Sequence, residues 1–200
     1  MKLLIAPASP FARKARVLLR EGRGLREVEE VAVATSPLAS DPAVLAANPT
    51  GRVPVLIRPN GPAIVDSRVI CRFLDARLEA GLYPEARLWE VLTLEALADG
   101  MADSAVLMAY ELRLRPEERR HRPWVEAQWG KVARGLDAIE ARWMSHLAGP
   151  LDMGQVAVAC LLGYLDLRHA ERGWRDGRPG LAAFAARMGA RPSLAETAPP

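Results

Sequence analysis

The stretch Asn48-Pro49-Thr50-Gly51-Arg52-Val53-Pro54-Val55-Leu56-Ile57 decides how the first half of this chain folds. Its first four residues have the composition of a turn, and the apolar residues from Val53 onward predict a strand. Proline lacks the N–H that a strand ladder needs, so Pro54 belongs to an edge, a strand start or a bulge. Two interpretations follow. The bond before Pro54 is trans at a strand start, or it is cis and turns the main-chain N–H and C=O of Val53 outward, where they could pair with an extended peptide.

Strand and helix patterns alternate on the N-terminal side of this stretch. Residues 3–6 predict a short buried strand, and Ser9-Pro10 predicts a helix start with Ser9 as the N-cap. Apolar residues at helical spacing follow on one face of that helix, while Arg13, Arg16 and Arg20 fall on the other face. Residues 28–33 then predict a second strand, and residues 41–47 predict a short helix.

The C-terminal side continues with a hairpin signal, Asn60-Gly61, which predicts a further strand over residues 63–65. Asp66-Ser67 predicts the start of a helix that runs to about residue 78. The order strand, helix, strand, helix, strand, strand, helix predicts an α+β domain with a mixed four-stranded sheet and helices packed on it.

Strand signals stop after residue 87, and long helical patterns follow over residues 89–114, 116–147, 152–168 and 179–188. The third is apolar nearly all round, which predicts a buried central helix, and Asp152 and Gln155 have the spacing of a capping box. We expect the Pro-rich tail to fray. The chain should therefore have a first domain over residues 1–79, a linker over 80–86 and an all-helical domain over 87–200.

Composition excludes several classes of protein. The chain has 200 residues and a net charge of +3, too small to indicate a nucleic-acid partner. No apolar stretch reaches the length of a membrane span, and the apolar start is too short for a signal peptide, so we expect a cytoplasmic protein with no membrane partner. Cys71 and Cys160 lie in apolar helical patterns and should be buried, reduced thiols. The three histidines lack metal-ligand spacing, so we expect no metal.

Two helix starts carry possible chemistry. Asp66-Ser67 is either a plain cap or a site for an α-amino acid group, since a helix N-terminus attracts a carboxylate and Asp66 could hold the ammonium. Ser9 is either a plain cap or a hydroxyl that stabilises a thiolate beside the free N–H groups of its helix. No general base lies near Ser9 in the sequence, so it is a poor nucleophile.

Three segments in order, Ser9-Pro10-Phe11-Ala12-Arg13-Lys14, residues 48–56 and Asp66-Ser67-Arg68-Val69-Ile70, resemble the glutathione S-transferases, in particular the bacterial YibF-like members with a Ser-Pro-Phe start. The resemblance covers the whole chain. It implies a thioredoxin-like first domain, an all-α second domain, a cis Val53–Pro54 bond and a homodimer. One departure is Asp152 with Gln155, where the family usually has Ser or Thr followed three residues later by Asp.

The resemblance also implies residue roles. Ser9 would face the sulfur of glutathione, which serves as co-substrate without any cofactor. Glutathione-binding positions would be Phe11, Arg52, Val53, Pro54, Asp66, Ser67 and, across a dimer, Asp103, which would reach the γ-glutamyl ammonium held by the neighbouring subunit.

Three functions remain open from the sequence. The first is an enzyme that adds the glutathione thiolate to a small apolar electrophile, and the second is a non-catalytic glutathione-binding carrier or interaction protein. The third, a thiol-disulfide reductase, needs a cysteine where Ser9 stands. Four residues are mostly candidates for the core, although some of them could line an apolar pocket for the second substrate: Leu107, Met108, Tyr110 and Trp174.

Overall fold

The computed structural model describes residues 1–200, which divide into two compact units. The first unit contains Met1–Leu88 together with Pro192–Pro200, and the second contains Trp89–Arg191. The last nine residues thus group with the first unit, whereas the sequence pattern assigned them to the helical domain. No helix has both the length and the apolar character needed to cross a membrane.

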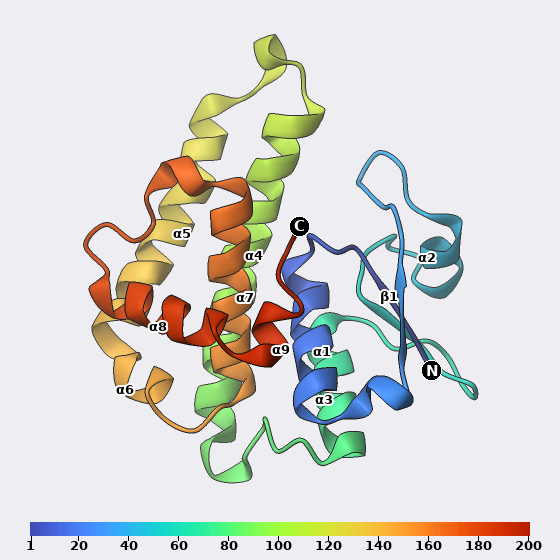
Figure 1. The fold of residues 1–200 in the computed structure, drawn as a ribbon. Helices are drawn as coiled ribbons and strands as arrows, with labels where there is room; N and C mark the ends of the chain where they lie inside the picture. Colours follow the sequence, from blue (N-terminus) through green and yellow to red (C-terminus); the bar gives the residue numbers. More distant parts are fainter. The chain divides into compact units, whose positions relative to one another are not determined.

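The first unit is built on a three-stranded sheet in the order β2-β1-β3. The strands are β1 (Lys2–Ile5), β2 (Glu29–Ala32) and β3 (Val55–Ile57). Strand β1 runs parallel to β2 and antiparallel to β3. Helices α1 (Pro10–Glu21) and α3 (Ser67–Leu78) pack on each other on one side of β1, and α2 (Pro42–Ala47) lies on the other side (Figure 1).

The predicted four-stranded sheet is not found, because the fourth strand is reduced to one residue. Ile64 exchanges two main-chain hydrogen bonds with Leu56, at 3.0 and 2.9 Å, and forms an isolated antiparallel bridge. The chain has no room for a longer ladder. On one side the Pro62 carbonyl accepts hydrogen bonds from the Arg58 side chain, and on the other Asp66 already caps α3.

The second unit is helical, as the pattern after residue 87 predicts. Its helices are α4 (Leu88–Leu114, which starts at the unit boundary), α5 (Arg122–Arg142), α6 (Met144–Leu147), α7 (Met153–Arg168) and α8 (Pro179–Gly189). Helix α7 is buried along most of its length, which confirms the predicted central helix. Asp152 caps it: Oδ1 accepts a hydrogen bond from the N–H of Gln155 at 3.1 Å, and Oδ2 lies 2.8 Å from Nε2 of His146.

The tail does not fray, so that expectation is wrong. A further short helix, α9 (Pro192–Ala195), follows α8 and packs against α1 within the first unit. Leu194 is 2% exposed and Thr197 is completely buried. Tertiary contacts stabilise this segment, and a helix of four residues is too short to show a helical period in the sequence.

Candidate functional site

The strand register brings three separate segments to one edge of the sheet. Here, this edge is the end of the sheet at which β1 finishes and β3 begins. Because β1 and β3 are antiparallel and Leu4 pairs with Val55, the end of β1 lies beside the start of β3. The loop that leads to Ser9 therefore begins at the same edge as Val53. The chain after β3 turns back and pairs antiparallel at Ile64, so it heads for this edge again when it reaches Asp66.

Val53 presents its main chain at this edge. The Val53–Pro54 bond is cis, as the second interpretation of Pro54 predicts. The N–H and C=O of Val53 make no hydrogen bond in the structure. The Val53 side chain packs against the buried cluster of Leu4, Val44 and Val55, which anchors the residue. A pair of unsatisfied main-chain groups on an anchored residue is what an added extended peptide requires.

The loop before Val53 is held by Asn48, whose role the sequence analysis missed. Asn48 is 4% exposed, and its side chain makes three hydrogen bonds. Nδ2 donates to the Arg52 carbonyl at 2.8 Å, while Oδ1 accepts from the N–H of Thr50 at 3.1 Å and from its hydroxyl at 2.9 Å. An asparagine within a turn motif was the available signal, since this side chain often bonds the main chain two residues on.

Ser9 caps α1 and still has a hydrogen to donate. Its backbone is extended, and its Oγ accepts a hydrogen bond from the N–H of Ala12 at 3.2 Å. A serine hydroxyl has one donor and two acceptor lone pairs, so the cap leaves the O–H available. The structure thus confirms that Ser9 is a cap and leaves a role toward a sulfur chemically possible.

Asp66 and Ser67 form the start of α3. Asp66 Oδ1 accepts a hydrogen bond from the N–H of Arg68 at 3.0 Å, and the Asp66 side chain is 58% exposed. Its second oxygen lies 3.4 Å from the Arg68 guanidinium, a solvent-exposed contact of small energetic value. Ser67 is 4% exposed at the first helical position, where N–H groups lack intrahelical acceptors.

The other two predicted residues of this unit flank the same edge. Phe11 is half-buried in the first turn of α1, and Arg52 is exposed directly before Val53. The glutathione roles assigned to all of these residues stay predictions. Neither Cys71 nor Cys160 is in a disulfide, and both are buried, as predicted.

The candidate residues of the second unit fall into two groups. Asp103 is exposed on α4, Leu107 is 45% exposed and Tyr110 is half-buried. Met108 is completely buried, and Trp174 is 1% exposed with its indole N–H donating to Asp166 at 2.7 Å. Met108 and Trp174 therefore belong to the core of this unit. The pocket role of these residues and the dimer role of Asp103 stay predictions.

Tyr164, on α7, has a strongly shifted pKa. Burial raises the pKa of Tyr164 to about 12, although the nearby Arg168 and Arg113 act in the opposite direction. At neutral pH this tyrosine is a neutral hydrogen-bond donor. It has no tendency to form a tyrosinate that could take a proton from a thiol.

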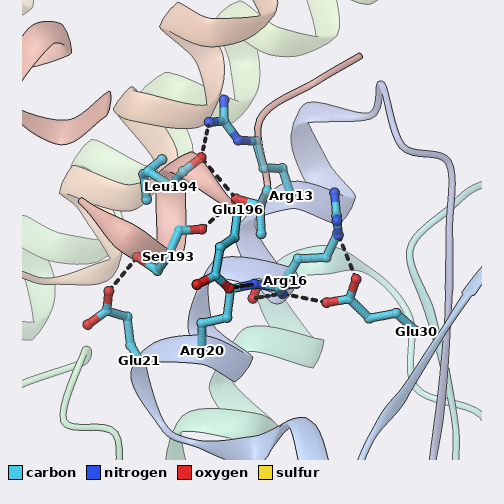
Figure 2. Close-up of polar contacts among 9 residues, drawn as sticks. Arg13, Arg16, Arg20, Glu21, Glu30, Ser193, Leu194 and Glu196 are labelled. Carbon is cyan, nitrogen blue, oxygen red and sulfur yellow. Dashed lines mark hydrogen bonds and ion pairs between the residues drawn. The ribbon is translucent and has the colours of Figure 1, made fainter. Parts of the chain in front are cut away.

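Helix α1, which carries Ser9, is tied to β2 by a charged cluster. Arg16 and Arg20 contact the two oxygens of Glu30 at 2.9 and 2.6 Å (Figure 2). Burial acts to raise the pKa of Glu30, but hydrogen bonds and charge from Arg20 and Arg16 outweigh it, so the net pKa is lowered. The carboxylate is therefore ionised at neutral pH and fixes α1 beside the sheet.

Comparison with known proteins identifies the family. The N-terminal domain model of glutathione S-transferases matches residues 8–77, and the C-terminal domain model matches residues 122–187. The uncharacterized GST-like protein YibF of Escherichia coli K12 is 31% identical over 100% of this chain and 99% of its own length.

Two crystal structures from Pseudomonas fluorescens Pf-5 are similar over the whole chain. A glutathione transferase family member with bound glutathione is 42% identical with a TM-score of 0.97, covering 100% of this chain and 98% of that one. A family member with bound S-(propanoic acid)-glutathione is 40% identical with a TM-score of 0.92, covering 100% of both chains. These matches extend over both units of the structure, and the chain belongs to the glutathione S-transferase family.

Proposed function

We propose that this chain binds glutathione along the sheet edge and transfers its thiolate to a small apolar electrophile. The observation that carries this proposal is the unsatisfied main-chain pair of Val53 at the edge that also receives Ser9 and Asp66. Support comes from the relative from Pseudomonas fluorescens, whose crystal structure holds glutathione.

The cysteinyl and γ-glutamyl parts of glutathione each have a matching group. The N–H and C=O of Val53 pair with the cysteinyl main chain as a short added strand. The γ-glutamyl carboxylate binds the N–H groups at the start of α3, where the helix dipole favours an anion. The γ-glutamyl ammonium binds the exposed carboxylate of Asp66, whose second oxygen is not used by the cap.

The sulfur lies at the start of α1. Ser9 donates its O–H to the sulfur while its lone pair keeps the Ala12 N–H, and the helix N-terminus adds a partial positive charge. Both lower the pKa of the thiol, which loses its proton to water because no base adjoins Ser9. The thiolate then forms a carbon–sulfur bond, and the electron pair displaced from the electrophilic carbon departs with a leaving group or moves onto the neighbouring atom of a polarised double bond. Binding contributes proximity, and the donors at the helix start stabilise the anion.

We further propose a cytoplasmic homodimer in which Asp103 reaches the glutathione of the neighbouring subunit. Exposed Leu107 and half-buried Tyr110 are the members of the predicted apolar pocket that a second substrate could touch directly. A relative's structure with S-(propanoic acid)-glutathione supports a pocket that accepts a substituent on the sulfur.

The second candidate is a carrier that binds glutathione without conjugating it. The specific observation in its favour is that the Ser9 hydroxyl already serves as a cap, and no general base lies near Ser9 in the sequence. Without a base beside it, a serine hydroxyl activates the glutathione thiol less than a neighbouring base or a charged hydrogen-bond donor would.

Calorimetry with glutathione, combined with a conjugation assay, tests the proposal. Asp66→Asn keeps an efficient helix cap but removes the charge, so glutathione should bind about tenfold more weakly. Ser9→Ala should reduce the conjugation rate more than the affinity. Unchanged affinity in the Asp66→Asn variant refutes the proposed binding mode, and wild-type binding without turnover favours the carrier.

A further inference from the structure

Arg13 is a buried cation in the helix that carries Ser9. The Arg13 residue is 6% exposed, and its guanidinium Nη2 donates to the main-chain carbonyl of Leu194 at 2.9 Å. Its Nε is buried with no hydrogen-bond partner. No carboxylate forms an ion pair with it. Burying a charge is costly unless an opposite charge or several hydrogen bonds accompany it, so this arrangement calls for an explanation.

The neighbouring arginines of α1 are arranged differently. Arg16 and Arg20 both contact Glu30, and Arg20 also contacts Glu196 at 3.1 Å. Figure 2 shows these two side chains directed to carboxylates, whereas Arg13 is directed to the Leu194 carbonyl. Arg13 is therefore the member of the three whose positive charge is not neutralised by a contact.

The acceptor of Arg13 belongs to a well-ordered segment. Thr197 is completely buried, and its hydroxyl lies 2.7 Å from the Ser193 carbonyl and 3.4 Å from the Leu194 carbonyl. The Ser193 hydroxyl donates to Glu21 at the far end of α1. The segment Pro192–Pro200 thus contacts α1 at its last turn and again at Arg13, near its first turn (Figure 2).

Arg13 is placed to act on Ser9. It lies four residues after Ser9, and its N–H donates to the Ser9 carbonyl at 3.0 Å, so the two residues share one face of the helix. Long side chains in a helix lean toward its N-terminus. A guanidinium held on this face adds to the positive potential of the helix start, and partial removal from water strengthens the effect.

We propose that Arg13 is a positioning residue for the glutathione sulfur. The C-terminal segment Pro192–Pro200 holds the Arg13 guanidinium through the Leu194 carbonyl. This contact fixes the positive charge of Arg13 and the first turn of α1 beside the sulfur. This inference rests on the proposed function, because it requires glutathione at Ser9. The C-terminal segment is then a working part of the thiolate site, although it is far from Ser9 in the sequence.

The test measures the ionisation of bound glutathione directly, by the ultraviolet absorbance of the thiolate as a function of pH. This readout needs no turnover, so it applies to an enzyme and to a carrier. Arg13→Met should move the midpoint of thiolate formation to higher pH by about half a unit or more. Arg13→Lys should restore most of the shift, because lysine keeps the charge and can donate to Leu194.

Two tail variants examine the link to the C-terminal segment. Thr197→Val keeps the volume but removes the hydroxyl that supports the Leu194 turn, so the midpoint should move in the same direction by a smaller amount. In the Arg13→Met background, Thr197→Val should add nothing, since both changes act through one contact. Glu196→Gln is the matched control: it removes the exposed contact with Arg20 and should leave the midpoint unchanged.

The outcomes separate this inference from the proposed function. If the wild-type chain binds no glutathione by calorimetry, both are overturned. If the wild type binds glutathione and the midpoint of Arg13→Met equals that of the wild type, only the role of Arg13 is overturned, even when its melting temperature falls. If Arg13→Met does not fold, Thr197→Val decides: an unchanged midpoint in that variant overturns the inference.

Discussion

Replacing Asn48 by alanine tests whether the loop before Val53 is built as the structure indicates. The substitution removes three hydrogen bonds that the buried side chain makes to Thr50 and Arg52. Each such bond has a net value of about 0.5–1.5 kcal/mol. Thr50 and Arg52 are exposed, so water replaces part of what is lost and the lower end of the range applies. We expect the free energy of unfolding to fall by about 2 kcal/mol, and the melting temperature of a chain of this size to fall by about 4–8 °C.

The same change should weaken glutathione binding, because the loop ends at the main-chain groups of Val53. Asn48→Asp is the matched control. It keeps an oxygen that accepts from Thr50 but places a second carboxylate oxygen against the Arg52 carbonyl, so its stability should also lie below that of the wild type. Scanning calorimetry gives the stability and titration calorimetry the affinity. If Asn48→Ala melts at the wild-type temperature, the loop does not depend on this side chain and the reasoning fails.

Three further predictions concern stability. Gly51 has φ +68°, and an added Cβ would lie 2.5 Å from Oγ of Ser40, so Gly51→Ala should lower the free energy of unfolding by about 2 kcal/mol. Gly81 has φ +71° but open space around an added Cβ, so Gly81→Ala is the control and should lower the free energy of unfolding by less. Urea unfolding measures both variants. Asp152→Ala removes a cap and a contact with His146 and should cost about 2–4 kcal/mol, whereas Asp152→Ser should recover part of it; equal stability of the two variants would argue against the cap. Burial lowers the pKa of His169 in spite of its hydrogen bond to the Ala105 carbonyl, so the unfolded chain takes up a proton near pH 6.5 before the folded one does. The contribution of His169 to stability is therefore complete above that pH and is lost as the pH falls below it, and His169→Gln should remove this part of the dependence measured by denaturation.

Local signals in the sequence predicted the helix starts and the special proline correctly. Ser9, Asp66 and Asp152 each accept a hydrogen bond from a main-chain N–H in the first turn of the helix they precede. A cap is specified by a few adjacent residues, so it can be recognised without knowing the tertiary fold. The cis Val53–Pro54 bond was one of two interpretations, and the family resemblance favoured it.

Features that depend on distant segments were missed. The spacing of Arg13, Arg16 and Arg20 indicated a polar face, but Arg13 is buried and donates to a carbonyl in a segment that starts almost 180 residues later. The fourth strand was predicted from the hairpin signal Asn60-Gly61, but it is reduced to Ile64, because Pro62 on one side and Asp66 on the other already bond to Arg58 and to α3. Neither outcome can be obtained from periodicity, which describes one element at a time.

Capping and ligand binding use different atoms of Ser9, and this permits a substitution that separates them. Alanine removes both the lone pair that accepts from Ala12 and the O–H that would face the sulfur. Aspartate caps a helix as well as serine does, and its charge is favourable at the helix N-terminus, so Ser9→Asp should fold with at least the wild-type stability. It has no proton to donate at neutral pH, and its charge repels a thiolate. We therefore expect Ser9→Asp to keep the wild-type melting temperature while the midpoint of thiolate formation in bound glutathione moves to higher pH. A variant that melts normally and ionises glutathione at the wild-type pH would show that Ser9 is a cap and nothing more.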